Sequence, residues 1–383
     1  MSDAPQAAAG IVVGVPRETQ PGEHRVALVP EVAAKFAAAG ARLLIERGAG
    51  APAQFPDALY KNVEFADGAA AVYGRADLLL KVQPLTPAEA ALLRPGAVHA
   101  GFMQSHNNLP AVKVLRDGNV TSFAMELVPR ISRAQSMDAL SSQAAIAGYK
   151  AVLIGANTLD RFFPMLTTAA GTIRPAQVLV IGVGVAGLQA IATAKRLGAI
   201  VEAYDVRSAT RDQVKSLGAK FVETGVTAEG AGGYARELTA EEKQKQQEVL
   251  DGRIAAADVV VTTAGVPGRP APKIISRAAV ERMKAGAVIV DILAENGGNC
   301  ELTRAGETVQ HGGVRVVGPV NLPAQLAYHA SEMYARNLYN LLSPALKKGV
   351  LSIDWSDEVF AGTVLTHGGQ VKHEPTAKLL ANG

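Results

Sequence analysis

The stretch VLVIGVGVAGLQAIATAKRLGAIVEAYD, residues 178–205, decides the fold of this chain. An apolar run is followed by glycines in a GxGxxG spacing, a segment of helical periodicity and a second apolar run that ends in an acid. The first glycine of such a pattern permits a tight turn, the second lets a phosphate approach the backbone, and the third lets the helix pack on the strand. The stretch therefore predicts a βαβ unit that binds a dinucleotide.

Six consecutive residues form the predicted phosphate-binding turn: Gly182, Val183, Gly184, Val185, Ala186 and Gly187. The positive end of the helix that begins near Ala186 favours an anion at this turn. A GxGxxG spacing alone is a weak signal in a chain with 38 glycines, and a structural turn without a ligand is the alternative.

The acid that closes the second apolar run indicates which nucleotide is bound. Asp205 follows the turn by about 20 residues, where an acid accepts hydrogen bonds from the adenosine ribose and repels a 2′-phosphate. Asp205 therefore favours NAD(H) over NADP(H), and the adjoining Val206 and Arg207 are predicted to bind the nucleotide as well. Arg207 is a caution, because an arginine just beyond the acid can meet a 2′-phosphate.

Further apolar runs on both sides of this unit predict two α/β domains. One series lies at 177–182, 200–205, 219–223, 257–264, 287–292 and 315–320, and an earlier one at 11–16, 41–48, 76–84, 96–103 and 120–127. Helical segments between the runs indicate mainly parallel sheets. The fold class is therefore α/β, with two Rossmann-like doubly wound domains joined by long helices.

The predicted boundaries give a first domain of residues 1–140 plus 330–383 and a second of residues 141–329. A long helix within 132–162 connects the two, and the helix after Leu326 returns to the first domain. Residues 355–371 are expected to add a small hairpin-like cap. The glycine-rich loop near 224–240 is too long for an ordinary connection and is interpreted as a mobile lid, followed by a solvated helix at 239–250.

The end of the fourth strand of the second domain is a further candidate for the ligand site. Ala264 and Gly265 follow that strand, and strand ends near a switch point line the ligand crevice of such sheets. Their small side chains are expected to let the nucleotide pass, with an ordinary turn as the alternative.

Composition excludes several classes of function. The net charge is only +3 and the 38 basic residues are scattered among 35 acidic ones, so no nucleic-acid-binding surface is predicted. A single cysteine, Cys300, excludes an intrachain disulfide and a CxxC metal site and fits a reducing compartment. The first ten residues lack signal-peptide features. Residues 175–194 carry no charge, but their glycines and their strand-then-helix pattern indicate a buried βα unit rather than a membrane span.

Longer motifs place the chain near a known group. The segments GVPRETQPGEHRVALVP (14–30) and KVQP (81–84), with the glycine turn, resemble the alanine dehydrogenase and pyridine nucleotide transhydrogenase superfamily over nearly the whole chain. Within it, MELVPRISRAQSMDALSSQAAIAGYKAV (125–152) and VDILAENGGNC (290–300) resemble the NAD(H)-binding components of proton-translocating NAD(P)+ transhydrogenases.

Two departures separate the chain from the dehydrogenases of this superfamily. Phe102 stands where the resemblance places their catalytic histidine, and Glu295 stands where they carry an aspartate. Arg25 and Lys81 match the residues that hold the substrate in those enzymes, and we expect them to be structural here.

The resemblance to transhydrogenases implies a second set of site residues, on the segment 129–138. It implies that Arg130 and Asp138 form an ion pair and, with Ser141, hold the nicotinamide, while Gln135 bridges toward the partner's nucleotide. It also implies that Tyr234 lies on a mobile loop that closes over the nucleotide. The alternatives are a loop tyrosine without such a role and a solvated charge cluster made of Arg130, Arg133 and Asp138.

The resemblance thus implies hydride exchange between NAD(H) on this chain and NADP(H) on a separate component, coupled to proton translocation by a membrane-spanning component. It further implies a homodimer, peripheral on the cytoplasmic face of the cell membrane. No metal site is expected. No general base is required, because hydride passes between two nicotinamide rings without a proton. The alternatives are an alanine-type amino-acid dehydrogenase and a non-catalytic NAD-sensing module.

Overall fold

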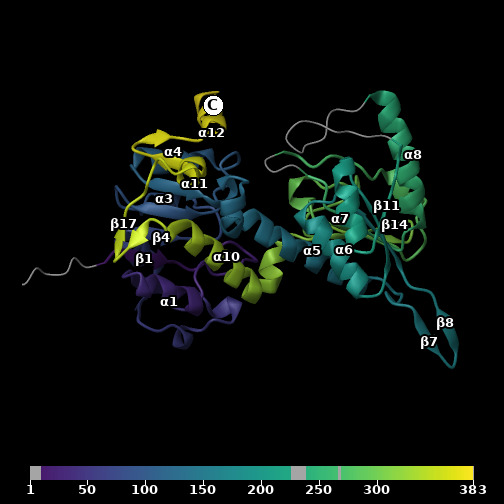
Figure 1. Cartoon of the computed structure of the whole chain (residues 1–383), viewed down its shortest axis with the longest axis horizontal. Helices are drawn as coiled ribbons and strands as arrows, with labels where there is room; N and C mark the ends of the chain where they lie inside the picture. Colours follow the sequence, from purple (N-terminus) through teal and green to yellow (C-terminus); the bar gives the residue numbers. More distant parts are fainter. Residues whose placement is uncertain (1–9, 226–238, 266–268, 383) are drawn as a thin grey trace, which may run out of the picture. The chain divides into compact units, whose positions relative to one another are not determined.

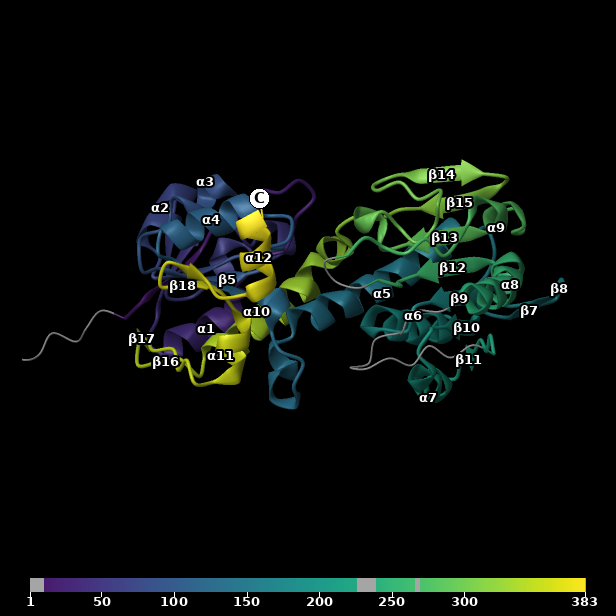
Figure 2. The same cartoon turned by 90° about the horizontal axis from the view of Figure 1, so that it is seen from above.

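The computed structural model describes residues 10–225, 239–265 and 269–382. The chain divides into two compact units: unit 1 consists of Met1–Gln143 and Ala324–Gly383, and unit 2 consists of Ala144–Pro323. Each unit is a sheet covered by helices on both faces (Figure 1; Figure 2). The predicted fold class, α/β with two doubly wound and mainly parallel sheets, is confirmed.

In the described residues, unit 1 contains a sheet of eight strands in the order β19-β18-β6-β5-β4-β1-β2-β3. Their bounds are β1 (Val12–Val15), β2 (Arg42–Glu46), β3 (Val63–Ala66), β4 (Leu78–Leu80), β5 (Val98–Gly101), β6 (Thr121–Ala124), β18 (Val364–His367) and β19 (Gln370–Val371). The first six strands pair in parallel, and β18 and β19 add an antiparallel edge.

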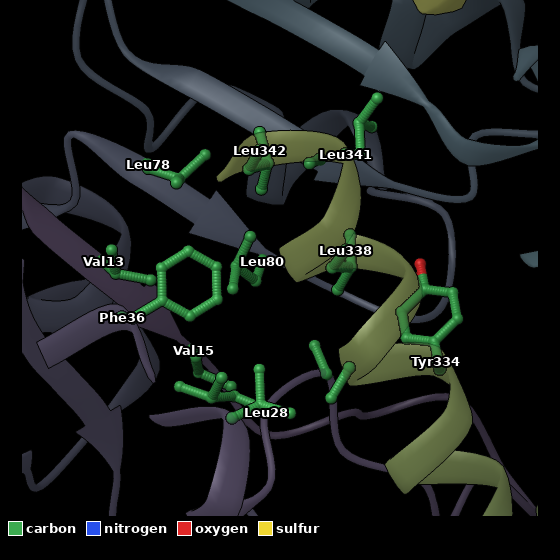
Figure 3. Close-up of a cluster of buried hydrophobic side chains, with 14 of the residues drawn as sticks. Val13, Val15, Leu28, Phe36, Leu78, Leu80, Tyr334, Leu338, Leu341 and Leu342 are labelled. Carbon is green, nitrogen blue, oxygen red and sulfur yellow. The ribbon is translucent and has the colours of Figure 1, made fainter. Parts of the chain in front are cut away.

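Two buried clusters cover the two faces of this sheet. On one face lie α1 (Pro30–Ala38), α10 (Ala327–Leu342) and α11 (Glu358–Thr363), and on the other α2 (Ala69–Arg75), α3 (Pro87–Ala90) and α4 (Leu109–Asp117). Figure 3 shows Phe36 of α1 and Leu338 of α10 meeting Leu80 of β4 in the first cluster. Because these side chains are fully buried, α10 is firmly held on its apolar face.

The C-terminal end of the chain differs from its prediction as a small cap. The hairpin β18–β19 is present, but β18 pairs with β6 and so extends the main sheet. Helix α12 (Glu374–Asn382) follows it and packs on α4. A short hairpin of β16 (Leu346–Lys347) and β17 (Val350–Leu351) lies between α10 and α11.

In the described residues, unit 2 contains a sheet of seven strands in the order β11-β10-β9-β12-β13-β15-β14. Their bounds are β9 (Gln177–Ile181), β10 (Ile200–Tyr204), β11 (Lys220–Phe221), β12 (Val259–Thr262), β13 (Val288–Asp291), β14 (Thr308–His311) and β15 (Val314–Val317). The six predicted strands pair in parallel, and β14, which the sequence did not indicate, is an antiparallel edge. The alternating exposure of its residues suits such an edge position.

Helices cover both faces of the unit 2 sheet as well. One face meets α6 (Val185–Arg196), α7 (Arg211–Ser216) and the later part of α5 (Ala139–Thr158), which crosses the division between the units. The other face meets α8 (Ala240–Ala256) and α9 (Arg277–Glu281). Because both faces are covered, β12 and β13 are buried at every residue.

Two local features of unit 2 have clear causes in the sequence. Helix α8 begins with a capping box, in which the Thr239 and Glu242 side chains satisfy each other's backbone N–H groups. A second hairpin, of β7 (Leu166–Thr168) and β8 (Gly171–Ile173), was not predicted and projects away from the sheet of unit 2 (Figure 1). Among the described helices, none is both long and apolar enough to cross a membrane.

Candidate functional site

The predicted dinucleotide site of unit 2 lies at the switch point of its sheet. Strands β9 and β12 are neighbours, and the chain leaves them in opposite directions along the sheet. The glycine turn 182–187 follows the carboxyl end of β9, and the segment 263–265 follows that of β12. Ligands of doubly wound sheets bind at this place.

Each of the three glycines of the turn is explained by a different physical constraint. Gly182 has a φ of +92°, and a Cβ there would lie 2.8 Å from the Ala264 nitrogen. A Cβ on Gly187 would lie 1.9 Å from the Gly182 oxygen. A Cβ on Gly184 would meet no described atom within 4 Å, and the φ of this residue is −86°. The first and third glycines are therefore required by the fold, whereas the open space at Gly184 fits a pyrophosphate, which a Cβ would obstruct.

The amino end of α6 adds unpaired donors to this space. Gly184 is the N-cap of the helix, and in the described structure no side chain caps this end. The first intrahelical bond runs from the Leu188 nitrogen to the Gly184 oxygen, at 2.8 Å. The N–H groups of the first turn, which includes Val185 and Ala186, are consequently available to an anion. Helix α5 approaches this helix start closely at Gly148, where a Cβ would lie 2.0 Å from the Ala186 oxygen.

Asp205 follows β10 and has a structural role that sequence reasoning missed. Its carboxylate accepts a hydrogen bond of 2.7 Å from the Val183 nitrogen, so it fixes the glycine turn. Arg207 donates to the same carboxylate from its backbone nitrogen, Nε and Nη2, each at 2.9 Å. Arg207 Nη2 also donates to the Val183 oxygen, at 3.2 Å. Asp205, Arg207 and the turn therefore form one unit, and a ribose that bonds to Asp205 has to share its carboxylate with Arg207.

The residues after β12 are fixed by two side chains that the sequence analysis did not select. Thr263 Oγ1 donates to the Gly182 oxygen at 2.9 Å. Asn299, fully buried, accepts from the Ala264 nitrogen at 3.2 Å and donates to the Ala264 oxygen at 2.7 Å. The polar segment NGGN (296–299) is visible in the sequence. Only the fold shows that Asn299 forms hydrogen bonds with a residue 35 positions away.

The other predicted positions of unit 2 have packing explanations. A Cβ on Gly265 would lie 2.6 Å from Leu293 Cδ1, which explains a small residue there without a ligand. Val206 is partly buried against the core on the α8 and α9 face. Tyr234 and most of the predicted lid, residues 226–238, lie outside the described residues. Roles for Val206, Ala264 and Gly265 in nucleotide binding stay predictions.

Unit 1 has the same strand order around its own switch point, between β1 and β4, but charged side chains fill it. Glu18, which follows β1, accepts from Lys81 Nζ at 2.8 Å and from the Val82 nitrogen at 2.6 Å. Glu23 forms a buried ion pair of 2.6 Å with Arg25. Arg25 and Lys81 thus pair with the chain's own carboxylates, and their structural role stays a prediction.

Burial has strong electrostatic effects in this cluster. Desolvation raises the pKa of the Glu18 carboxyl, although Lys81 opposes the rise. Desolvation also raises the pKa of Tyr334 well above its ordinary value, and the Tyr334 hydroxyl donates to the Lys81 oxygen at 2.9 Å. On β5, desolvation lowers the pKa of His99 to about 3. The neutral form of His99 therefore dominates at physiological pH.

The two positions that depart from the dehydrogenase pattern make a ring contact and a hydrogen bond, respectively. The Phe102 ring lies 5.3 Å from the Tyr334 ring, centroid to centroid, and offers no titratable proton. In unit 2, Glu295 is exposed and accepts from the Asn321 nitrogen at 3.1 Å.

The segment 130–141 of unit 1 contains the remaining predicted residues. Gln135 lies exposed on η4, a 3-10 helix of residues Ser132–Met137. Asp138 caps α5, because its carboxylate accepts from the Ser141 nitrogen at 2.9 Å and from Ser141 Oγ at 2.6 Å. The predicted ion pair between Arg130 and Asp138 is not formed in the described structure. Arg130 is exposed instead, and Asp138 is used by the helix start.

Arg133, the other arginine of this segment, pairs with the start of α11. It donates to the Asp357 carboxylate, at 3.1 Å from Nη1, and lies 3.4 Å from Glu358. Arg133 and Asp138 therefore have structural partners, whereas the Gln135 side chain is exposed.

Comparisons with known proteins find matches along most of the chain. Residues 14–147 match the N-terminal domain of the alanine dehydrogenase/PNT family, and residues 151–374 match its C-terminal domain. The chain is 46% identical over 374 residues to an NAD(P) transhydrogenase alpha subunit of Rhodospirillum rubrum, covering 94% of this chain and 97% of the relative. It is 33% identical over 297 residues to alanine dehydrogenase of Mycobacterium tuberculosis, covering 76% of this chain and 75% of the relative.

A solved structure gives the same result. The crystal structure of transhydrogenase from Sinorhizobium meliloti superposes with a TM-score of 0.86 at 43% identity, covering 94% of this chain and 99% of that one. The open glycine turn in unit 2, the charge-filled switch point in unit 1 and these similarities agree: the chain belongs to the alanine dehydrogenase/PNT family.

Proposed function

We propose that this chain is the NAD(H)-binding component of a proton-translocating NAD(P)+ transhydrogenase. It would exchange hydride with NADP(H) on a partner component, while a membrane-spanning partner couples the exchange to proton movement. The similarity to a transhydrogenase alpha subunit over 94% of the chain supports this reading. A homodimer, peripheral on the cytoplasmic face of the membrane, belongs to the same proposal.

The observation that carries the proposal is Phe102. A dehydrogenase that acts on an amino acid needs a proton donor or acceptor beside the reacting carbon. By the resemblance, Phe102 stands at the position of that residue, and in the structure its ring packs against Tyr334. Hydride exchange between two nicotinamides moves no proton in that step. It needs positioning of the rings and exclusion of water, which a chain without such a base can supply.

In this proposal the chain contributes binding and positioning. The N–H groups at the start of α6 bind the pyrophosphate, and Asp205, oriented by Arg207, accepts hydrogen bonds from the ribose. By the resemblance, Arg130, Asp138 and Ser141 engage the nicotinamide, and Gln135 reaches toward the nucleotide of the partner. The bound nucleotide supplies the transferable hydride.

The test is NADPH-dependent reduction of an NAD analogue, first with this chain alone and then with an NADP(H)-binding transhydrogenase component added. Reduction only with both proteins present supports the proposal. A matched variant, Gln135→Asn, should bind NADH like the wild type but transfer hydride much more slowly.

Two further measurements address the alternatives. Turnover of alanine with NAD+ by the chain alone would overturn the proposal in favour of an amino-acid dehydrogenase. NADH binding without hydride transfer to any added component would favour an NAD-sensing module.

A further inference from the structure

The 3-10 helix η4, which carries Gln135, is held by two asparagines of α10. Asn337 Nδ2 donates to the backbone oxygen of Ser136 at 2.9 Å, and Asn340 Nδ2 donates to the same oxygen at 3.0 Å. Ser136 directly follows Gln135, so the carbonyl of the next residue along η4 is fixed from α10.

The two asparagines differ in how they are themselves held. Asn337 is 7% exposed, and its Oδ1 accepts from Ser142 Oγ at 2.7 Å. Both ends of its amide therefore have partners, and its orientation is determined. Asn340 is only partly buried, and its contact with Ser136 lies on the solvent side. Water can replace that contact at little cost.

Hydrogen bonds connect Asn337, through Ser142 and Gln143, to the buried charges of unit 1. Gln143 Nε2 donates to Ser142 Oγ at 3.2 Å, and Gln143 Oε1 accepts from Arg25 Nη1 at 2.9 Å. Arg25 is fixed in turn by its buried ion pair with Glu23. A buried polar network whose members are satisfied is rigid, and α10 is also fixed by Leu338 and Tyr334 in the apolar cluster (Figure 3).

We propose that Asn337 is a positioning residue for hydride transfer, which acts through Gln135. It fixes the Ser136 carbonyl, and with it the end of η4, from a rigid helix, and so sets the direction in which the exposed Gln135 side chain projects. The expected effect of Asn337 on the rate of hydride transfer rests on the proposed function. Its structural basis, the anchoring of η4, does not.

The test variant is Asn337→Asp, which preserves shape and the acceptor for Ser142 but removes the donor to Ser136. A displacement of about 1 Å can slow a positioned reaction about 100-fold. We expect the rate of hydride transfer to the partner component to fall at least about tenfold on this scale, while the Kd for NADH changes less than about twofold. Asn340→Asp is the matched control, with the same chemistry at the same carbonyl, and should change the rate little.

A double-mutant cycle separates positioning from general damage. If Asn337 acts through Gln135, Asn337→Asp should slow transfer in the wild type but have little further effect in the Gln135→Asn background. The same fractional loss in both backgrounds would overturn the proposal, as would an unchanged rate in the single variant. Ser142→Ala, which frees the Asn337 amide to rotate, is the second variant if Asn337→Asp fails to fold, and should lower the rate in the same direction.

Amide hydrogen exchange in the full-length chain, without nucleotide or partner, tests the anchor separately. Exchange at residues 132–138 should accelerate in Asn337→Asp and stay near the wild-type rate in Asn340→Asp. Equal protection in all three proteins would overturn the anchor. No transfer by the wild type with its partner would overturn the proposed function and the kinetic role with it. Wild-type transfer with an unaffected variant would overturn only the role of Asn337.

Discussion

Replacing Gly184 by alanine should separate nucleotide binding from folding. The φ of −86° and ψ of −164° are accessible to alanine, and the added Cβ would meet no described atom within 4 Å. The residue is an N-cap, where alanine is less favourable than glycine, by about 1 kcal/mol at most. For a unit of this size that corresponds to a fall in Tm of about 2–4 °C.

The effect on binding should be much larger. The Cβ would occupy the space into which the pyrophosphate must come to reach the N–H groups of α6. A hydrogen bond to a charged group contributes about 1.5–3 kcal/mol, so losing one or two of them costs about 3 kcal/mol. This corresponds to an increase of about 100-fold in the Kd for NADH.

Gly187→Ala is the matched comparison, because its Cβ would lie 1.9 Å from the Gly182 oxygen. Overpacking of this kind costs about 1–3 kcal/mol, so Tm and affinity should fall together. Calorimetric titration with NADH and thermal unfolding of both variants measure the two effects. If Gly184→Ala is folded and binds NADH within about twofold of the wild type, the pyrophosphate does not lie at this turn, and the reasoning is refuted.

Three other substitutions test separate regions of the structure. Asp205→Asn should raise the Kd for NADH and narrow the preference over NADPH, because the carboxylate that repels a 2′-phosphate is lost; unchanged selectivity in titrations with both nucleotides would contradict this role. His99, with its pKa lowered to about 3, takes up a proton in the unfolded chain before the folded one, so acid destabilises the fold. Between pH 7 and pH 5 this lowers the free energy of unfolding by about 2 kcal/mol. In denaturant unfolding, His99→Gln should lose less stability over this pH range than the wild type, and an equal loss in both proteins would exclude His99 as the cause. Arg133→Gln removes a partly exposed ion pair with Asp357 and should lower stability by less than about 1 kcal/mol in thermal unfolding; a larger loss would mean that this pair anchors η4 more strongly than its exposure suggests.

The glycine turn could be predicted because its constraints are local. A positive φ at Gly182 and a close approach at Gly187 concern residues within a few positions or on the neighbouring strand. The apolar strands of both sheets were evident for a similar reason, since burial on both faces leaves a continuous apolar run. Strands β3 and β14 were missed because they are edge strands with exposed residues and lack such runs.

Contacts between distant residues could not be predicted in the same way. The clasp of Asn299 on Ala264 and the bonds of Asn337 and Asn340 to Ser136 depend on how elements pack. The sequence shows that a polar side chain can form hydrogen bonds, but it does not show which group is the partner. The expected pair of Arg130 and Asp138 failed for a related reason, because the N-cap position of α5 already uses the Asp138 carboxylate.

The two sheets share one strand order, yet their switch points can do different things. In unit 1, an incoming carboxylate would compete with Glu23 for the buried Arg25. Separating such a pair leaves a buried charge and costs about 3–5 kcal/mol. At Gly184 in unit 2, an anion meets N–H groups of the helix start and displaces no side chain of residues 10–225, 239–265 and 269–382. The same architecture therefore favours an anion such as a nucleotide pyrophosphate at the switch point of unit 2 and disfavours a small carboxylate at that of unit 1, and the proposed function requires this combination.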